Sequence, residues 1–301
     1  MSKFNQPDPR NANTLVYVNG LVKRDEAKVS VLDSVVQGGD AVWEGLRVYN
    51  GHIFQLEHHL NRLMHSAHIL DFKNVPDRKA VRNAIFETLK ANGMTDGVHI
   101  RLTLTRGVKS TSGMNPNLNV NGCTLIVLPE YKGLVYGDEG LKLITSSVRR
   151  NPPFALDSKI HHNNLINNIL AKIEANYAGA DDAVMLDQHG YLSETNATNL
   201  FLVKDEVLYT PFANSCLPGF TRQAVMEIAE AQKVPFKEKD MTMAEMYTAD
   251  EVFTTGTMGA LSWVKVVDGR QIGNGRKGRM TQELQEWYGE KVKEESVPIP
   301  H

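Results

Sequence analysis

Short runs of alternating apolar and polar residues are separated along the chain by longer runs with helical spacing. The turn Asn50-Gly51 lies between two alternating runs, 46–49 and 52–55, and this combination predicts a β-hairpin. From Leu56 onward, apolar residues recur every three or four positions, which predicts a helix directly after the hairpin. Hairpins followed by helices favour an α+β fold over a parallel doubly wound sheet.

The second half of the chain shows the same mixture. A helix is predicted over 164–178, and a second one over 221–232 follows the turn residues Pro218 and Gly219. A strand is predicted over 251–255, where it ends at a glycine-containing turn. The side chains of the first helix that we expect to face the interior are Leu165, Ile169, Leu170, Ile173 and Tyr177.

The segment 131–138 contains two glycines and little periodicity, so we expect it to link two domains. The first domain would be 1–130, a small α/β domain, and the second would be 139–301. With 301 residues, the chain is long enough for each domain to have its own core.

Composition narrows the function classes. The chain is 42% hydrophobic and 23% charged, as in globular proteins, and its net charge of −2 gives no reason to expect nucleic acid or a membrane surface as a partner. No apolar run approaches the roughly 20 residues needed to span a bilayer, and residues 1–14 contain no apolar signal core. We therefore expect a cytoplasmic protein.

Cysteine and histidine spacing argues against a disulfide framework and against a metal site. Cys123 and Cys216 show neither a disulfide pattern nor metal-ligand spacing. Histidines are adjacent at 58–59 and at 161–162, so neither pair shares a helix face as ligands four residues apart would. We expect no metal ion in this protein.

Lys159 and Glu194 are the candidates for chemistry. Lys159 lies in a weakly polar stretch before a predicted helix, and Glu194 follows across one helix and one hairpin. A lysine in an apolar site loses proton affinity and can form a Schiff base with an aldehyde cofactor, whose ring nitrogen a carboxylate would hold. Taken singly, each residue has a commoner interpretation, Lys159 as a surface lysine and Glu194 as a loop acid that caps a local turn.

Two glycine turns are suited to a phosphate. In 217–222, Gly219 precedes a helix whose dipole favours an anion, and in 254–259 hydroxyl groups follow a strand end. Arg62, on the helix after the hairpin, would be the charged clamp. The alternatives, a plain turn, a helix cap and a surface arginine, are individually the commoner interpretations.

The order of these motifs is more specific than any one of them. Over nearly the whole chain it resembles the fold-type IV pyridoxal-phosphate enzymes, the class IV aminotransferases, and most closely the branched-chain amino-acid aminotransferases. The segments that carry this resemblance are 42–47, 57–63, 217–222 and 250–257. It implies two α/β domains with pyridoxal 5′-phosphate between them, and a homodimer in which a loop of the partner closes the site.

The resemblance also implies residue roles. Lys159 would bind the cofactor covalently and act as the catalytic proton shuttle, while Glu194 would pair with the pyridine nitrogen. The implied cofactor-binding residues are Lys159, Arg62, Glu194, Phe220, Thr221 and Thr257. The implied substrate-binding residues are Trp43, Arg47, His99, Arg101 and Met258.

The implied reaction is ping-pong transamination from an L-amino acid of branched-chain type to 2-oxoglutarate, with Arg101 or Arg47 on the second carboxylate of the co-substrate. It would place the protein in branched-chain amino-acid biosynthesis. The chain departs from the family pattern where three pocket tyrosines and a phenylalanine are usual. At these positions it has Gly38, His99, Asn164 and Trp43.

These departures leave alternatives open. D-amino-acid aminotransferases and (R)-selective amine transaminases share the scaffold and differ chiefly in this wall. A pyridoxal-phosphate-dependent lyase would need no amino acceptor. In a different class altogether, a metabolite-binding protein would have Lys159 on its surface and would not bind the cofactor.

Overall fold

The structure is a computed structural model that describes residues 8–134, 136 and 138–300. The chain forms two compact units: unit 1 comprises Met1–Gly133, Ile160–Asn164 and Glu295–His301, and unit 2 comprises Leu134–Lys159 and Leu165–Glu294. Two short segments that follow the predicted linker, 160–164 and 295–301, are thus grouped with unit 1. The predicted domain limits stay a prediction, and positions 135 and 137 of the linker 131–138 lie outside the described residues.

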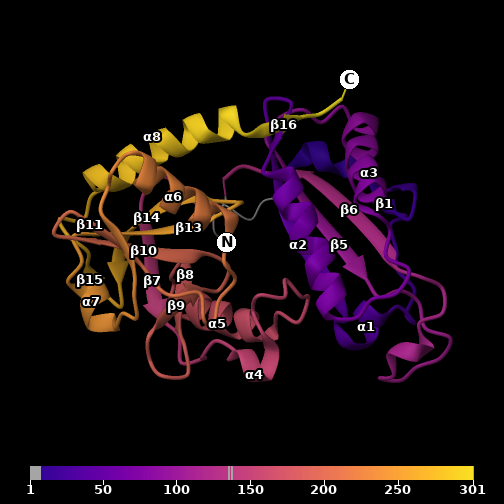
Figure 1. Cartoon of the computed structure of the whole chain (residues 1–301), viewed down its shortest axis with the longest axis horizontal. Coiled ribbons are helices and arrows are strands. Elements are labelled where there is room, and N and C mark those ends of the chain that lie inside the picture. Colours follow the sequence, from indigo (N-terminus) through magenta and orange to yellow (C-terminus); the bar gives the residue numbers. More distant parts are fainter. Residues whose placement is uncertain (1–7, 135, 137, 301) are drawn as a thin grey trace. The chain divides into compact units, whose positions relative to one another are not determined.

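Unit 1 is built on a sheet with the order β16-β4-β3-β5-β6-β1-β2. Helices α2 and α3 cover one face of this sheet, and leucine, isoleucine and valine side chains fill the space between them (Figure 1). The strands are β1 (Leu15–Val18), β2 (Leu21–Lys23), β3 (Ala41–Tyr49), β4 (His52–Phe54), β5 (Val98–Thr105), β6 (Thr124–Tyr131) and β16 (Ser296–Pro298). The helices are α1 (Ser34–Gly38), α2 (Leu56–Ile69) and α3 (Arg78–Ala91), with single 3₁₀ turns at Pro9–Asn13 and Pro116–Leu118.

The hairpin predicted around Asn50-Gly51 is confirmed. Strands β3 and β4 pair antiparallel, with Tyr49 opposite His52. Asn50 and Gly51 have φ values of 47° and 77°, the left-handed conformation that a two-residue hairpin turn requires and that these residues adopt most readily. The helix predicted from Leu56 is also confirmed as α2, which begins at that residue.

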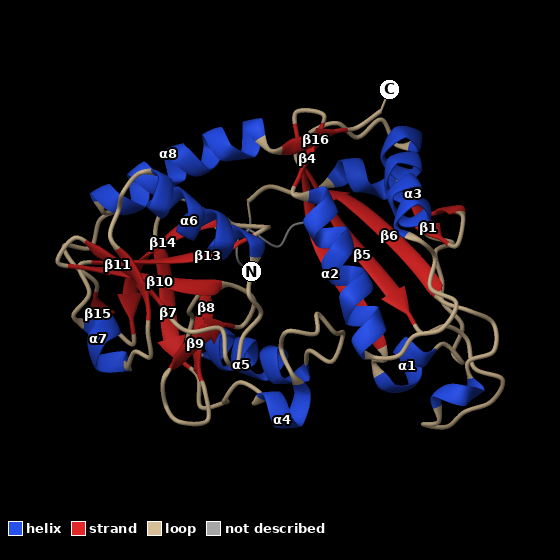
Figure 2. Ribbon diagram, viewed as in Figure 1, coloured by secondary structure: helices blue, strands red, loops and turns tan. Residues whose placement is uncertain are grey.

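Unit 2 contains a nine-stranded sheet in which β9 pairs back onto β10 (Figure 2). Helix α5 packs on β8, α6 on β13, and α8 on β14. The strands are β7 (Leu141–Thr145), β8 (Asp182–Leu186), β9 (Leu192–Thr195), β10 (Asn199–Lys204), β11 (Val207–Thr210), β12 (Phe236–Glu238), β13 (Glu251–Gly256), β14 (Ala260–Val267) and β15 (Arg270–Gln271). The helices are α4 (Pro153–Leu156), α5 (Ile166–Tyr177), α6 (Phe220–Ala231), α7 (Met243–Tyr247) and α8 (Arg279–Glu294).

Helix α5 exists as predicted, but the prediction of its inward face was wrong. Ala171 and Ala175 are fully buried and pack against strand β8. Because alanine is small, these two positions allow the helix backbone to lie close to the sheet. The larger side chains are exposed instead: Ile166 is 67% exposed, Ile169 49%, Leu170 46%, Ile173 42% and Tyr177 90%.

Helix α8 has the longest apolar stripe of unit 2. Its buried residues Met280, Leu284, Tyr288 and Val292 recur every four positions and face the sheet and α6. The opposite side of the helix is charged. Across the described ranges, no helix is both long enough and apolar enough to cross a membrane.

Candidate active site

Glu44 is the centre of a buried cluster in unit 1. It lies on β3 between Val42 and Leu46, on the face that α2 covers, and it is fully buried. Arg62 binds it through two nitrogens, with Nε 2.7 Å from Oε1 and Nη2 2.7 Å from Oε2. His59, three residues earlier and therefore on the same side of the helix, donates from Nδ1 to Oε2 over 2.7 Å.

A third basic side chain approaches the same carboxylate from another segment. His161 Nδ1 lies 3.1 Å from Glu44 Oε1, without the alignment of a hydrogen bond. The backbone of this segment follows β3: the Trp43 N–H donates to the His161 carbonyl over 2.9 Å, and the Asn163 N–H donates to the Ala41 carbonyl over 2.8 Å. The residues that follow Lys159 in sequence are thereby fixed to unit 1.

Burial and charge compete at Glu44. Burial by itself would raise the pKa of the Glu44 carboxyl, but His161 and Arg62 outweigh it and hold that pKa well below its ordinary value. Burial lowers the pKa of His59, and it lowers the pKa of His161 to about 4. At neutral pH the cluster therefore consists of one carboxylate, one guanidinium and two neutral imidazoles.

The predicted substrate residues of unit 1 lie together on the other face of the same sheet. Strands β3 and β5 place Arg47 opposite His99 and Gly45 opposite Arg101. The guanidinium carbon of Arg101 lies 3.4 Å from the centre of the Trp43 ring. Trp43 thereby holds Arg101 flat against the sheet.

Several polar atoms on this face have no partner. Arg47 Nε and Nη1 and His99 Nε2 are buried without a hydrogen bond. Burial lowers the pKa of His99 to about 3 and that of Arg101 to about 10, so at neutral pH the imidazole is neutral and the guanidinium is charged. A buried donor without a partner costs free energy, so this face suits an acidic ligand that would supply acceptors.

In unit 2, Lys159 lies at the end of a loop that follows α4. Its side chain is 49% exposed, and its Nζ lies 3.8 Å from Asp157 Oδ1. The Lys159 backbone N–H donates to the same Asp157 oxygen over 2.9 Å. The amine is therefore accessible while its backbone is held in place.

Glu194 is the buried carboxylate of unit 2. It lies on β9, where it pairs in register with Asn199 of β10. Arg150 Nη2 lies 2.9 Å from Oε1, and Asn199 Nδ2 donates weakly to Oε2 over 3.4 Å. Burial raises the pKa of Glu194 to about 7, although Arg150 opposes that shift.

Asn199 connects Glu194 to the start of helix α6. Its Nδ2 donates to the Leu217 carbonyl over 2.9 Å, and its Oδ1 accepts from the Gly219 N–H over 3.1 Å. A Cβ atom at Gly219 would lie only 2.3 Å from that Oδ1, so the turn requires glycine. This contact fixes the helix start at Phe220, with the dipole favourable to an anion.

The remaining predicted residues occupy a turn. Thr257 and Met258 lie between β13 and β14 and are half-buried. Next to this turn, Thr255 pairs in register with Asn199, and its hydroxyl is buried without a partner. The strand register therefore relates the turn to Glu194 through Asn199.

The predicted site residues thus form two groups. Unit 1 holds Arg62, Trp43, Arg47, His99 and Arg101, and unit 2 holds Lys159, Glu194, Phe220, Thr221, Thr257 and Met258. Their assignment to a cofactor and a substrate stays a prediction. Sequence reasoning missed Glu44, Arg150 and Asn199, because a buried charge partner or a side chain that braces a turn has no local sequence signal.

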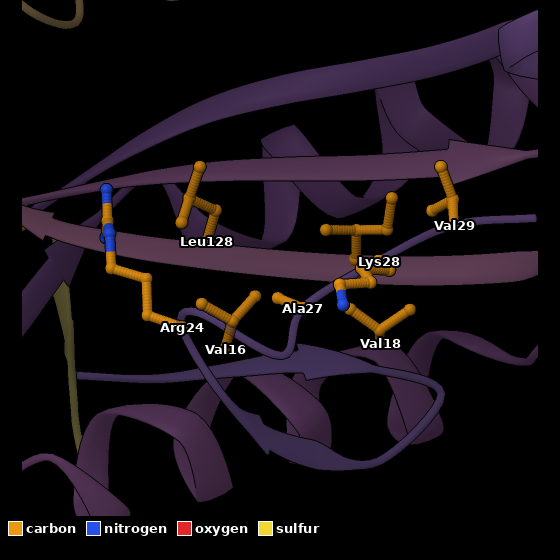
Figure 3. A pocket seen from close by; sticks show the side chains of 8 residues that line it. Val16, Val18, Arg24, Ala27, Lys28, Val29 and Leu128 are labelled. Atoms are coloured by element: carbon orange, nitrogen blue, oxygen red, sulfur yellow. The ribbon is translucent and has the colours of Figure 1, made fainter. Parts of the chain in front are cut away.

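Unit 1 also has a hollow of about 320 Å³ that contains none of these residues. Figure 3 shows it beside β1 and β6, and its lining is mainly apolar, with Arg24 and Lys28 at its edges. Its lining includes no carboxylate, hydroxyl or thiol, so we assign no chemistry to it.

Comparison with known proteins gives a consistent family. Residues 41–267 match the family described as amino-transferase class IV. The chain is 56% identical over 296 residues to branched-chain-amino-acid aminotransferase-like protein 2 of Arabidopsis thaliana, a match that covers 98% of this chain and 53% of that protein. The chain thus spans about half the length of this relative.

Solved structures agree. The branched-chain amino acid aminotransferase of the organism abbreviated T.th., with pyridoxamine 5′-phosphate, has a TM-score of 0.90 and 33% identity, and the match covers 98% of this chain and 100% of that one. The same enzyme complexed with N-(5′-phosphopyridoxyl)-L-glutamate has a TM-score of 0.89 and 33% identity, with the same coverage.

Proposed function

The chain belongs to the class IV aminotransferases, and on that premise we propose that it is a pyridoxal-phosphate-dependent transaminase. It would move the amino group of an L-amino acid of branched-chain type to 2-oxoglutarate in a ping-pong sequence. The observation that carries the proposal is the connected group in unit 2. An accessible amine at Lys159, a buried carboxylate at Glu194 and a glycine-started helix are linked there by hydrogen bonds.

The residues present fit the cofactor. Bound pyridoxal 5′-phosphate supplies an aldehyde that receives the amino group and a ring that withdraws electrons from the substrate. Lys159 would hold it covalently and Glu194 would meet its ring nitrogen. The start of α6 at Phe220 and Thr221, the Thr257 hydroxyl and Arg62 would hold its phosphate, and the buried Thr255 hydroxyl without a partner marks polar capacity beside them.

Lys159 and Glu194 would divide the proton chemistry. Once substrate has displaced it, the Lys159 amine is free to take a proton from the substrate α-carbon and to return it at a second carbon. Glu194 would exchange a proton with the ring nitrogen, a task suited to a carboxyl whose pKa burial raises to about 7. Proton transfer by Lys159 requires an accessible amine, which its 49% exposure provides.

The sheet face of unit 1 supports the substrate proposal. Arg47 and Arg101 would receive the second carboxylate of glutamate or 2-oxoglutarate, and His99 would add an acceptor or a donor as a neutral imidazole. A solved relative carries a phosphopyridoxyl-L-glutamate ligand, which is consistent with glutamate as co-substrate. The backbone at Thr257 and Met258 would lie near the α-carboxylate, and Trp43 would supply apolar surface for a branched side chain.

A half-reaction panel tests the proposal. The purified protein is loaded with pyridoxal 5′-phosphate, and its long-wavelength absorbance is followed after separate additions of L-leucine, L-glutamate, D-alanine and (R)-1-phenylethylamine. Loss of that absorbance with L-leucine and L-glutamate is the expected result. Loss only with D-alanine or the (R)-amine would assign one of the alternative specificities instead, and no cofactor absorbance at all would refute the enzyme assignment.

We further propose that the functional form is a homodimer, because helix α5 exposes an apolar stripe that a second copy would cover. The stripe consists of Ile166, Ile169, Leu170, Ile173 and Tyr177. Ile173→Asp should yield a monomer by light scattering, because a charge would be buried at the contact. Asn176→Asp, exposed on the same helix, is the matched control and should leave the dimer intact. A dimeric I173D variant would refute this surface, and the cytoplasmic location stays a prediction.

A further inference from the structure

Arg150 is a buried arginine to which neither the sequence motifs nor the proposed reaction assigns a role. It follows β7 in unit 2 and is only 6% exposed. All three of its guanidinium nitrogens are engaged with residues from four other segments. The acceptors are Ser215 O at 3.3 Å, Asn167 Oδ1 at 3.2 Å, Asn168 Oδ1 at 2.9 Å, Ser158 Oγ at 2.8 Å and Glu194 Oε1 at 2.9 Å.

The asparagine contacts of Arg150 are themselves fixed. Asn167 Nδ2 donates to the Arg149 carbonyl over 2.8 Å, and Asn168 Nδ2 donates to the Asn196 carbonyl over 2.6 Å. Each amide therefore presents its oxygen to the guanidinium in one orientation. Together these contacts hold the planar guanidinium in place before any ligand binds.

One nitrogen of Arg150 meets both functional segments. Nη2 lies within hydrogen-bonding distance of Glu194 and of Ser158, the residue directly before Lys159. The Ser215 carbonyl in turn accepts from both Arg150 Nε and the Ser158 hydroxyl. Because Arg150 carries a permanent charge, it is also the cation that faces the buried carboxylate of Glu194.

We propose that Arg150 is a positioning residue that fixes Glu194 toward the cofactor ring nitrogen and ties it to the segment that carries Lys159. The inference rests on the proposed function. Arginine is needed because its planar fork meets acceptors in several directions with fixed geometry, whereas a lysine presents one ammonium group on a flexible stem.

Loss of Arg150 changes the charge balance at Glu194. Burial and Asp182 raise the pKa of Glu194, while Arg150 and the Leu217 backbone N–H lower it. Without the guanidinium, Glu194 stays protonated over a wider pH range and is no longer oriented by the Nη2 contact. Its ability to pair with a ring nitrogen falls accordingly.

The test compares two cofactors and two arginines. Arg150→Gln is measured against Arg149→Gln, the exposed neighbour whose contacts are backbone carbonyls. Dissociation constants are determined for pyridoxal 5′-phosphate and for 1-deazapyridoxal 5′-phosphate, in which C–H replaces the ring nitrogen. We expect R150Q to weaken the natural cofactor by about tenfold or more, as for loss of a charged hydrogen bond. The deaza analogue should lose less than about threefold, and R149Q should change neither value.

Two further variants sharpen the result. In an E194Q background, R150Q should add less than about threefold, because residues that act through one another are not additive. Arg150→Lys should recover part of the affinity, because the charge returns without the fork. If R150Q does not accumulate as folded protein, R150K decides: a loss confined to the natural cofactor supports the inference, and wild-type values overturn it.

Equal losses for both cofactors, or full additivity with E194Q, would reduce Arg150 to a structural residue and refute the inference. R150Q values equal to those of R149Q would refute it as well. In all these cases the wild-type protein still binds the cofactor and reacts with amino donors. A wild-type protein that does neither would refute the proposed function itself.

Discussion

Glu44 in unit 1 and Glu194 in unit 2 are both buried carboxylates on β-strands, at 0% and 5% exposure, yet their surroundings set opposite charge states. Glu44 faces a bidentate arginine and two histidines, and its pKa lies well below the ordinary value. Glu194 has one arginine contact through a single nitrogen, and burial raises its pKa to about 7. The difference lies in the number and geometry of the cationic partners, because burial acts in the same direction at both sites.

This contrast separates two tasks. A carboxylate that stays charged at all physiological pH values can hold Arg62 in a fixed position, but it cannot exchange a proton. A carboxyl that titrates near neutrality can exchange one, which is the property expected of a group beside a cofactor ring nitrogen. On this account unit 1 contributes fixed charges for binding, and unit 2 contributes the groups that take part in chemistry.

The largest effect should come from Lys159→Ala. If the chemistry belongs to unit 2, turnover should fall by at least about 10⁴-fold, since both the covalent hold on the cofactor and the proton transfer are lost. The circular-dichroism spectrum should remain that of the folded protein, because the side chain is half-exposed. Lys142→Ala, at an exposed position on β7, is the control and should keep wild-type activity. Substantial turnover in K159A would break the comparison at its centre.

Removal of the Glu44 carboxylate should be the largest stability effect. Glu44→Ala leaves Arg62 and two buried histidines without their acceptor, which should cost about 3–5 kcal/mol in the free energy of unfolding. Glu57→Ala, which removes a partly exposed carboxylate on the same helix as Arg62, should cost no more than about 1 kcal/mol. Urea denaturation measures both variants, and equal small losses would show that the Glu44 cluster is not a structural anchor.

The two carboxylates should also give opposite pH dependences of stability. An ordinary glutamate titrates at about 4.3 in the unfolded chain. Because the folded pKa of Glu194 is raised to about 7, its contribution is greatest below about pH 4.3 and is lost as the pH rises toward 7. The folded pKa of Glu44 is lowered, so its contribution is present above the unfolded value and is lost only as the pH falls into the acid range.

Unfolding of apo wild type, E194Q and E44Q between pH 4 and 8 separates these cases. The advantage of wild type over E194Q should shrink with rising pH by an amount on the order of 3 kcal/mol. Its advantage over E44Q should be constant near neutrality and should shrink only at acid pH. Differences that follow the same slope for both variants would contradict the contrast.

The smallest effect concerns the phosphate. Arg62→Lys keeps the charge beside Glu44 but loses the two-nitrogen fork, so affinity for pyridoxal 5′-phosphate should fall by about tenfold. Affinity for pyridoxal, which lacks the phosphate, should change little. Arg82→Lys, on α3 and 40% exposed, serves as the control. An R62K variant that loses both ligands equally would show that Arg62 does not contact the phosphate.

Prediction from sequence succeeded where the physics is local. The Asn50-Gly51 turn and the stripe from Leu56 specify their own geometry, and the fold-type IV family is confirmed by the match over residues 41–267. The inward face of α5 was wrong because the side that packs on β8 is set by alanines, while the larger residues are left exposed. Arg150 and Asn199 were missed because their roles depend on contacts between segments far apart in the chain.

The central claim is that Lys159 is the residue that holds and works on the cofactor. The direct test is to load the wild-type protein with pyridoxal 5′-phosphate, reduce the covalent bond with borohydride and map the modified peptide by mass spectrometry. The account predicts the label on Lys159, with none in K159A. A label on a different lysine, or no label on the wild-type protein, would contradict it.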